Sequence, residues 1–382
     1  MQVLIFNKPG KHLKDNFTFN NNMIECVNDY KYLGMKFTSS GIFKQGKEDM
    51  YKKSLKAVFK LQRALSSSNP SISTFLHLYD HTIKPILMYG SEITGMFKTS
   101  SAACRKENEY LLQQIYINDF IDKSHFKYLK YILGVNKKST NLAVLSELGR
   151  YPLYFSVVLS MLKYWFRIDK MESGLLSDAY IANQSMVSDN TECWLSSIKF
   201  ILQKLNIQHT GIKLNELVRS VRKHYAIVFF NYWNKKSKEP EGKLDTYFKI
   251  KKCFSRETYL SINNFRLRRA LCQIRISAHE LKIERDRYKK PYVERSQRIC
   301  EKCSSNQTED ELHFIINCPL YIDNREIMFN NIGELCPKFK DLPNEAKFIW
   351  LFTNEDISVL KLLGKYIIDC LDIRRGDYCC HK

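Results

Sequence analysis

Residues 298–321 read RICEKCSSNQTEDELHFIINCPLY and carry the clearest chemical pattern in the chain. Within them, Cys300, Cys303, His313 and Cys318 are spaced as C-x2-C-x9-H-x4-C. Three thiolates and one imidazole complete a tetrahedral zinc site, and the Cys-x2-Cys step lets one tight turn present two sulfurs to one ion. The stretch therefore predicts one structural zinc ion in a small zinc knuckle, a module associated with nucleic-acid binding.

The positive charges of the chain are concentrated in the residues that lead into this pattern. Lys and Arg outnumber Asp and Glu by 60 to 40, which gives the 382 residues a formal net charge of +20. Residues 211–299 hold 23 basic and 9 acidic residues, whereas residues 319–378 hold 8 and 10. Aromatic residues interleave with the charges in FRLRRALCQIRISAHELKIERDRYKKPY at 265–292.

A basic segment of this kind attracts polyanions and favours contact with RNA or DNA. A solvated helical surface that keeps the protein soluble is the alternative explanation of the same charges. His279 also lies here, and we expect a surface or packing role for it rather than a fifth metal ligand. The predicted nucleic-acid contacts in this segment are Arg266, Arg268, Arg269, Arg285 and Arg287.

Length and composition indicate a folded chain of about two to three domains. The hydrophobic content of 44% argues against disorder, and no apolar run approaches the length of a membrane span. The short apolar run at the amino terminus is too short for the core of a signal peptide. Because the 12 Cys occur without a secretory signal, they indicate reduced thiols and metal ligands, and we expect a nuclear or cytoplasmic protein.

The amino-terminal residues predict short strands at 3–6, 17–19, 23–27 and 30–37, of which the second and third flank an Asn-rich turn. Strands this short do not form an independent domain. They therefore either pair with a later part of the chain or belong to a larger sheet.

Helical periodicity begins near residue 43. One face of this first helix carries apolar and small residues, namely Ser54, Leu55, Val58, Leu61 and Leu65. Another face carries a basic row of Lys52, Lys56, Lys60 and Arg63. Such a row is usually a solvated surface, but along a duplex it would meet phosphates about 6 Å apart, one for each helical turn.

The rest of the chain is predicted to be helical apart from the knuckle, so the fold class is mainly α. Pro85 predicts a kink in a helix at 73–93, and a polar connection follows at 98–108. Gly134 and Gly149 are placed to end the next two helices, and Pro152 opens an apolar one. The predicted helices after the connection cover 111–133, 139–148, 152–166, 175–187, 191–206, 212–234, 320–331, 343–353 and 356–374.

The sequence contains none of the usual short catalytic motifs, such as a Gly-rich phosphate loop, G-x-S-x-G or H-E-x-x-H, and no catalytic residue is predicted. The tail residues Cys379, Cys380 and His381 stay unassigned. Adjacent cysteines at a chain end rarely bind one ion together.

Four parts of the sequence occur in the same order as four segments of one protein family. They are VLIFNKPGK with YKYLGMKFTSSG, then IKPILMYGSEI, then YLKYILGVNKKSTNLAVLSELGRYPL, and finally RICEKC with HFIINCPLY. Together they resemble the reverse transcriptases of non-LTR (LINE-type) retrotransposons, downstream of the catalytic palm. The first part is similar to the end of the palm and the hairpin that grips the primer. The others are similar to the thumb, the segment after the thumb and the zinc knuckle.

The resemblance implies a role for Tyr32, Leu33 and Gly34, which would abut a primer terminus, although simple strand packing explains Tyr32 and Leu33 equally well. It implies that the basic row follows a template–primer backbone, and that the basic segment with the knuckle holds element RNA or target DNA. The implied segments are palm-end strands with the hairpin at 1–41, thumb-like helices at 42–97, a helical linker at 98–290, the knuckle at 291–322 and a helical cap at 323–382.

Nucleotide transfer in that family uses carboxylates that hold two metal ions, typically in an Asp-Asp turn between palm strands. The sequence contains no Asp-Asp pair. We therefore expect the catalytic turn upstream of Val3, and a carboxy-terminal fragment without endonuclease that binds nucleic acid but does not polymerise DNA alone. The strand at 3–6 should then present an open edge.

Two other functions stay open. One is a domesticated, zinc-dependent module that binds a protein partner. The other is a part of an active reverse transcriptase whose remaining half is encoded upstream.

Overall fold

The computed structural model describes residues 2–6, 16–41, 43–66, 68–101, 104, 119–207, 211–238 and 242–376. Within these ranges the chain is mainly helical, which confirms the fold class at that level, and the strands lie between Gln2 and Thr38. Most of the polar connection at 98–108, the start of the helix predicted at 111–133 and the tail with Cys379, Cys380 and His381 lie outside the described residues.

The chain packs as two compact units. Unit 1 comprises Met1–Ala64, Leu76–His125 and Pro152–Phe229, and unit 2 comprises Leu65–Phe75, Phe126–Tyr151 and Phe230–Lys382. This division does not follow the five consecutive segments implied by the resemblance, because residues far apart in the sequence share each core.

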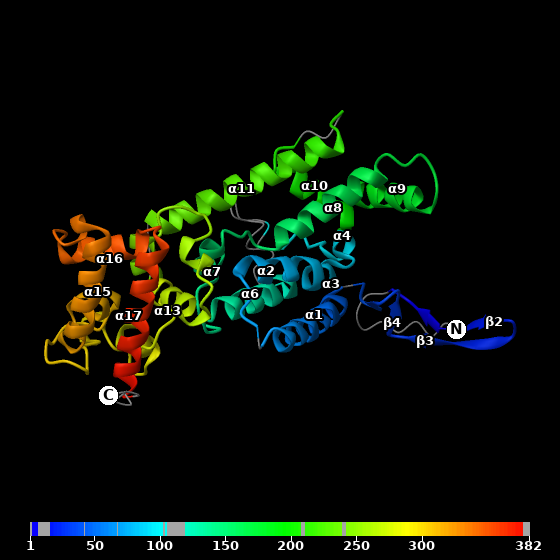
Figure 1. Ribbon diagram of the computed structural model, residues 1–382. Coiled ribbons are helices and arrows are strands. Elements are labelled where there is room, and N and C mark those ends of the chain that lie inside the picture. Colours follow the sequence, from blue (N-terminus) through cyan, green and yellow to red (C-terminus); the bar gives the residue numbers. More distant parts are fainter. Residues whose placement is uncertain are drawn as a thin grey trace. The chain divides into compact units, whose positions relative to one another are not determined.

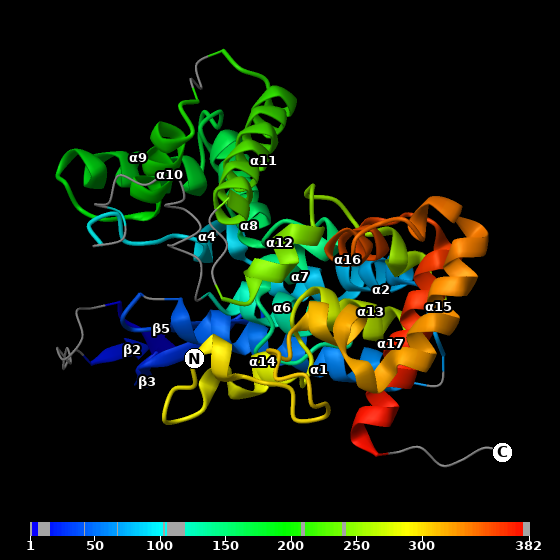
Figure 2. The ribbon, with the colours of Figure 1, turned by 90° about the vertical axis from the view of Figure 1, so that its left-hand side faces the viewer.

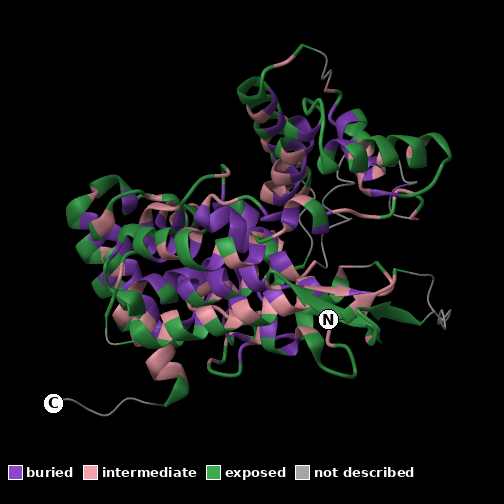
Figure 3. Cartoon of the chain, turned by 90° about the vertical axis from the view of Figure 1, so that its right-hand side faces the viewer, coloured by how far each residue is buried: buried purple, intermediate pink, exposed green. Residues whose placement is uncertain are grey.

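Unit 1 begins with a three-stranded sheet in the order β1-β3-β2, formed by β1 (Gln2–Leu4), β2 (Phe17–Phe19) and β3 (Asn22–Val27). β1 runs parallel to β3, with Gln2 opposite Glu25, and β2 runs antiparallel to it. In the described part of the chain no strand pairs with the other side of β1. Many residues of these strands are exposed, as the green colour in Figure 3 shows.

The single strand predicted at 30–37 is a hairpin of β4 (Asp29–Tyr32) and β5 (Met35–Thr38). Leu33 and Gly34 form its two-residue turn, with φ of +47° and +85°. Both angles lie in the left-handed region that the tightest hairpin turns require, and an alternating strand pattern does not reveal such a turn. The resemblance had implied a hairpin here.

The first long helix of unit 1, α1 (Lys44–Ala64), buries Gly46, Met50, Ser54 and Val58 at a spacing of four residues. The predicted apolar face is therefore right at Ser54 and Val58, whereas Leu61 is only half-buried. The Ser54 hydroxyl lies 2.8 Å from that of Ser124 in α6 (Phe120–Leu133), where the two helices pack together.

A π-helical turn just before Pro85 distorts the helix predicted at 73–93, and the helix breaks at Tyr89 and Gly90. The segment consists of α2 (Ile72–Leu78), a π-helical turn (Tyr79–Ile83), α3 (Lys84–Met88) and α4 (Ser91–Thr94). The Lys84 amide donates to the Tyr79 carbonyl, five residues back, and Pro85 has no amide hydrogen to donate. The remaining helices of unit 1 are α8 (Tyr154–Ile168), α9 (Leu175–Ser188), α10 (Trp194–Lys204) and the larger part of α11 (Leu214–Lys238).

Unit 2 is built mainly from helices that follow α11, of which α17 lies between α13 and α15 (Figures 1 and 2). Gly134 and Gly149 end α6 and α7 with positive φ, as predicted. A Cβ on Gly134 would also lie 2.8 Å from Cγ of Arg269, so glycine allows α13 to approach. The helices are α7 (Asn141–Leu148), α12 (Leu244–Ile250), α13 (Phe265–Arg275), α14 (Lys282–Arg285), α15 (Ile322–Leu335), α16 (Asn344–Thr353) and α17 (Ile357–Arg375).

A buried ion pair ties α7 to α13 in unit 2. Arg275 Nε donates to Glu147 Oε2 at 2.9 Å, and Arg275 Nη2 lies 2.8 Å from Glu257 Oε2. The Tyr259 hydroxyl donates to Glu147 Oε2 at 2.6 Å. Burial opposes ionisation of Glu147, but the charges of Arg275 and Lys251 outweigh it and hold the pKa of Glu147 below its ordinary value. Removing one partner of such a pair costs about 3–5 kcal/mol, so this network holds α13 in place.

Candidate metal centre

The four predicted metal ligands converge in unit 2. The three sulfurs and the ring nitrogen of Cys300, Cys303, His313 and Cys318 all lie within 4.8 Å of one another. Ligands that share one zinc ion at 2.0–2.3 Å stand roughly 3.5–4 Å apart, so small movements would complete a tetrahedron. His313 is 2% exposed and Cys318 is 1% exposed, whereas Cys303 is half-buried.

Two different backbone structures bring these ligands together. Cys300 and Cys303 lie in a turn that is closed by a bridge between Ile299 and Thr308, and the Cys300 amide donates to the Gln307 carbonyl at 2.9 Å. His313 begins a π-helical turn (His313–Asn317), and the Cys318 amide donates to the His313 carbonyl at 2.7 Å. A metal ion here would therefore link a hairpin-like turn to a helical turn.

The His313 ring is oriented for metal binding. Its Nδ1 lies 3.0 Å from Gln307 Oε1, which is an acceptor, so Nδ1 carries the proton. Nε2 lies 3.5 Å from Cys303 Sγ and presents its lone pair to the thiols. Burial lowers the pKa of His313, which favours the neutral ring that a metal requires. The sequence pattern did not identify Gln307 as an orienting partner, because outer contacts have no fixed spacing.

The thiols themselves suit a divalent cation. Burial raises the pKa of Cys300, and it raises the pKa of Cys318 to about 12. For Cys303, burial is outweighed by hydrogen bonds from Ser305, and the pKa is lowered. A metal ion would supply the positive charge that three neighbouring thiolates need. The donor set of three sulfurs and one nitrogen, with no open position, fits a structural zinc ion.

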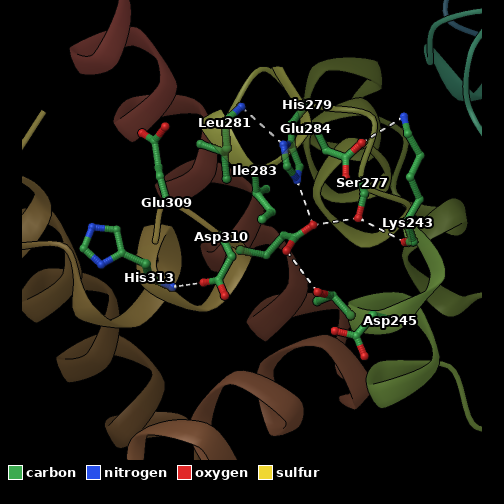
Figure 4. A network of polar contacts seen from close by, with 12 residues as sticks. Lys243, Asp245, Ser277, His279, Leu281, Ile283, Glu284, Glu309, Asp310 and His313 are labelled. Atoms are coloured by element: carbon green, nitrogen blue, oxygen red, sulfur yellow. Dashed lines mark hydrogen bonds and ion pairs between the residues drawn. The ribbon is translucent and has the colours of Figure 1, made fainter. Parts of the chain in front are cut away.

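His279 has a packing role, one of the two roles predicted for it. It is buried, and its Nε2 lies 2.9 Å from Glu311 Oε1 within the network of Figure 4. Ser277 and Thr246 also donate to the Glu311 carboxylate, at 2.6 and 3.0 Å. Burial opposes ionisation of Glu311, but the contacts with His279 and Ser277 lower its pKa to about 2. The network anchors the residues before His313 to α12 and to the end of α13.

The predicted nucleic-acid contacts of unit 2 differ in exposure and in the ion pairs that they form. Arg266 and Arg269 are exposed. Arg285 pairs with Glu301 at 2.7 Å, and the mostly covered Arg287 pairs with Glu284.

Arg268 requires a correction. It is 3% exposed, and its guanidinium donates to the carbonyls of Ile262 and Asn263 at 2.6 and 3.0 Å. Its position three residues into α13 turns it towards the core, so it holds the backbone and does not belong to the predicted binding surface.

The predicted contacts of unit 1 are accessible. Lys52, Lys56, Lys60 and Arg63 are all exposed along α1, and Lys52 forms an ion pair with Glu48 at 2.9 Å. Leu33 is 73% exposed at the hairpin turn, next to exposed Tyr32. The Tyr89 hydroxyl donates to the Leu33 carbonyl at 2.6 Å, and Lys53 Nζ donates to the Gly34 carbonyl at 3.1 Å, so these contacts hold the turn.

None of the helices in the described ranges is both long enough and apolar enough to cross a membrane. No protein-family model, curated protein or solved structure significantly matches the chain.

Proposed function

We propose that the chain binds nucleic acid through basic surfaces. We also propose that a zinc ion at Cys300, Cys303, His313 and Cys318 stabilises unit 2, which carries the Arg-rich segment around α13. The observation that carries this proposal is that the Cys and His cluster belongs to the same compact unit as the Arg-rich segment around α13. Zinc would act there as a structural cross-link, since all four coordination positions would be filled by the protein.

The family resemblance adds a context to this proposal. We propose that the chain corresponds to the thumb, linker and knuckle of a non-LTR retrotransposon reverse transcriptase, and that its own activity is to hold RNA or DNA. Polymerisation is not part of the proposal, because the sequence has no Asp-Asp pair to hold the catalytic ions.

The test is binding as a function of salt. Fluorescence anisotropy of labelled single-stranded RNA, single-stranded DNA and duplex DNA would be measured from about 50 to 300 mM salt, where phosphate contacts weaken through the return of counterions. We expect the logarithm of the affinity to fall linearly with the logarithm of the salt concentration, with a slope of about −3 or steeper. Absence of binding at the lowest salt, or binding that does not change with salt, would contradict the proposal and favour the protein-interaction module.

A further inference from the structure

A concave groove with a volume of about 1180 Å³ lies within unit 2. Its walls come from the end of α6, the start and middle of α13, residues 278–285, the end of α17 and the turn that carries Cys300 and Cys303. Seven Lys and Arg side chains line it, against two acidic ones, Glu280 and Asp372. A concave site with such an excess of one charge focuses its field on a ligand of the opposite charge.

Several of these positive charges are not neutralised by acidic side chains of the protein. Within the described part of the chain, the guanidinium of Arg269 and the ammonium of Lys302 have no hydrogen-bond or ion-pair partner. Arg266 and Arg375 share the single carboxylate of Asp372, at 4.0 and 3.2 Å. The groove therefore offers at least three net positive charges from three separate elements, which suits a chain of phosphates better than a single small anion.

Two aromatic rings stand among these charges. Tyr131 in α6 and Phe265 at the start of α13 both line the groove, and each is 37% exposed. The Tyr131 ring is held edge-on against Phe75, with 6.2 Å between centroids. Exposed aromatic rings beside cations are the arrangement on which unpaired bases stack, whereas the faces of bases in a duplex are already covered by their neighbours.

The metal centre and the groove adjoin each other through the turn between Cys300 and Cys303. Lys302 lies between the predicted ligands Cys300 and Cys303. The Glu309 carboxylate lies 3.7 Å from Cys300 Sγ, accepts from the Lys282 amide at 2.7 Å and pairs with Arg374 of α17. A metal ion that orders this turn would therefore also order one wall of the groove.

We propose that this groove binds a single-stranded segment of nucleic acid, with phosphates on Arg269, Lys302 and Arg375 and with bases on Tyr131 and Phe265. The inference rests on the proposed function and specifies its site and substrate class.

The experiment uses the full chain and labelled single strands of RNA and DNA with the same base order. Arg269→Glu is expected to weaken single-strand binding about 10-fold or more, because it reverses one phosphate contact. Phe265→Ala is expected to weaken it about 10-fold through the loss of one stacked base. Lys338→Glu, an equal charge reversal at an exposed position outside the groove, is expected to change it by less than about twofold. The RNA and DNA arms show which single strand the groove prefers.

A second measurement does not depend on variants. Photocrosslinking of a 5-iodouracil-containing strand to the wild-type protein is expected to label peptides that contain Tyr131 or Phe265. The inference is overturned if the wild-type chain binds single strands but both groove variants bind equally well and crosslinks fall elsewhere; nucleic-acid binding itself then stands. If the wild-type chain binds no nucleic acid, the proposed function fails as well.

Discussion

The basic row on α1 and the basic groove of unit 2 are both rich in Lys and Arg, yet they present their charges differently. The row lies along the convex surface of one helix, and its first member, Lys52, pairs with Glu48. The groove collects its charges from four helices, α6, α13, α14 and α17, and from the metal turn, around a hollow that also holds two aromatic rings. Charges on a convex surface are well solvated and are screened by salt. Charges that line a hollow add their fields at one bound ligand. We therefore expect the groove to bind a polyanion more strongly than the row does.

The largest effect is expected from loss of the metal centre, whose turn forms one wall of the groove. Cys318→Ser or Cys303→Ser should abolish the binding of one zinc per chain and loosen residues of about 295–322, because metal binding and local folding are linked. Zinc content by atomic absorption and hydrogen exchange by mass spectrometry measure both. Cys253→Ser, at an exposed cysteine, is the matched control and should keep its zinc. Unchanged metal content in both ligand variants would refute the four-ligand assignment.

The next effect concerns the support of the groove wall. Arg275→Met should destabilise unit 2 by about 3–5 kcal/mol, because it leaves the buried Glu147 carboxylate without its main counter-charge. Urea denaturation gives the free energy of unfolding. The double variant Arg275→Met/Glu147→Leu should recover part of the loss, since an apolar pair of similar volume needs no compensation. Equal stability of the single variant and the wild type would show that the pair does not hold α13.

The packing beneath the basic row should respond to pH. Asp122 in α6 is buried and accepts a hydrogen bond from the Leu153 amide at 2.8 Å. His125 Nδ1 lies 4.0 Å from its carboxylate, and the negative charge of Asp119 opposes its ionisation. Burial raises its pKa to about 7. The folded state thus holds this proton more tightly than the unfolded chain does. The contribution to stability is full below about pH 4 and is lost as the pH rises through 7, on the order of 4 kcal/mol in all.

Asp122→Asn should remove this dependence, which urea denaturation between about pH 5 and pH 8 measures through the slope of stability with pH. A slope that is the same in the Asn variant and in the wild type would assign the pH dependence to other groups.

The smallest effect is expected from the row itself. The double variant Lys56→Glu/Lys60→Glu should weaken single-strand binding by less than about threefold at 150 mM salt, because these charges are exposed to solvent, where salt screens them, and do not line the groove. Anisotropy with the strands used for the groove variants measures this directly. A loss equal to that of Arg269→Glu would remove the distinction between the two surfaces, and a larger loss would make the row on α1 the main single-strand binding surface.

Features that depend on neighbouring residues were predicted well. Gly134 and Gly149 end their helices with positive φ, a π-helical turn distorts the helix at Pro85, and the four metal ligands converge as their spacing indicated. Each of these depends on the conformational preference or the metal chemistry of residues a few positions apart.

Features that depend on distant residues were not predicted. Arg275 meets Glu147 across 128 positions, and His279 meets Glu311 across 32, without a sequence pattern that pairs them. Arg268 has the same charge as exposed Arg266 and Arg269, yet the packing of α13 turns it inward.

The sequence by itself determined that the chain is mainly helical and strongly basic and that it carries a Cys and His pattern with the spacing of a zinc site. These properties follow from composition, from periodicity and from ligand chemistry over short distances. Only the tertiary structure decided which Arg side chains are accessible, that two aromatic rings lie beside them, and that the metal turn forms part of the same groove. Such facts arise when helices far apart in the sequence pack together, because burial and electrostatic fields depend on distance in space.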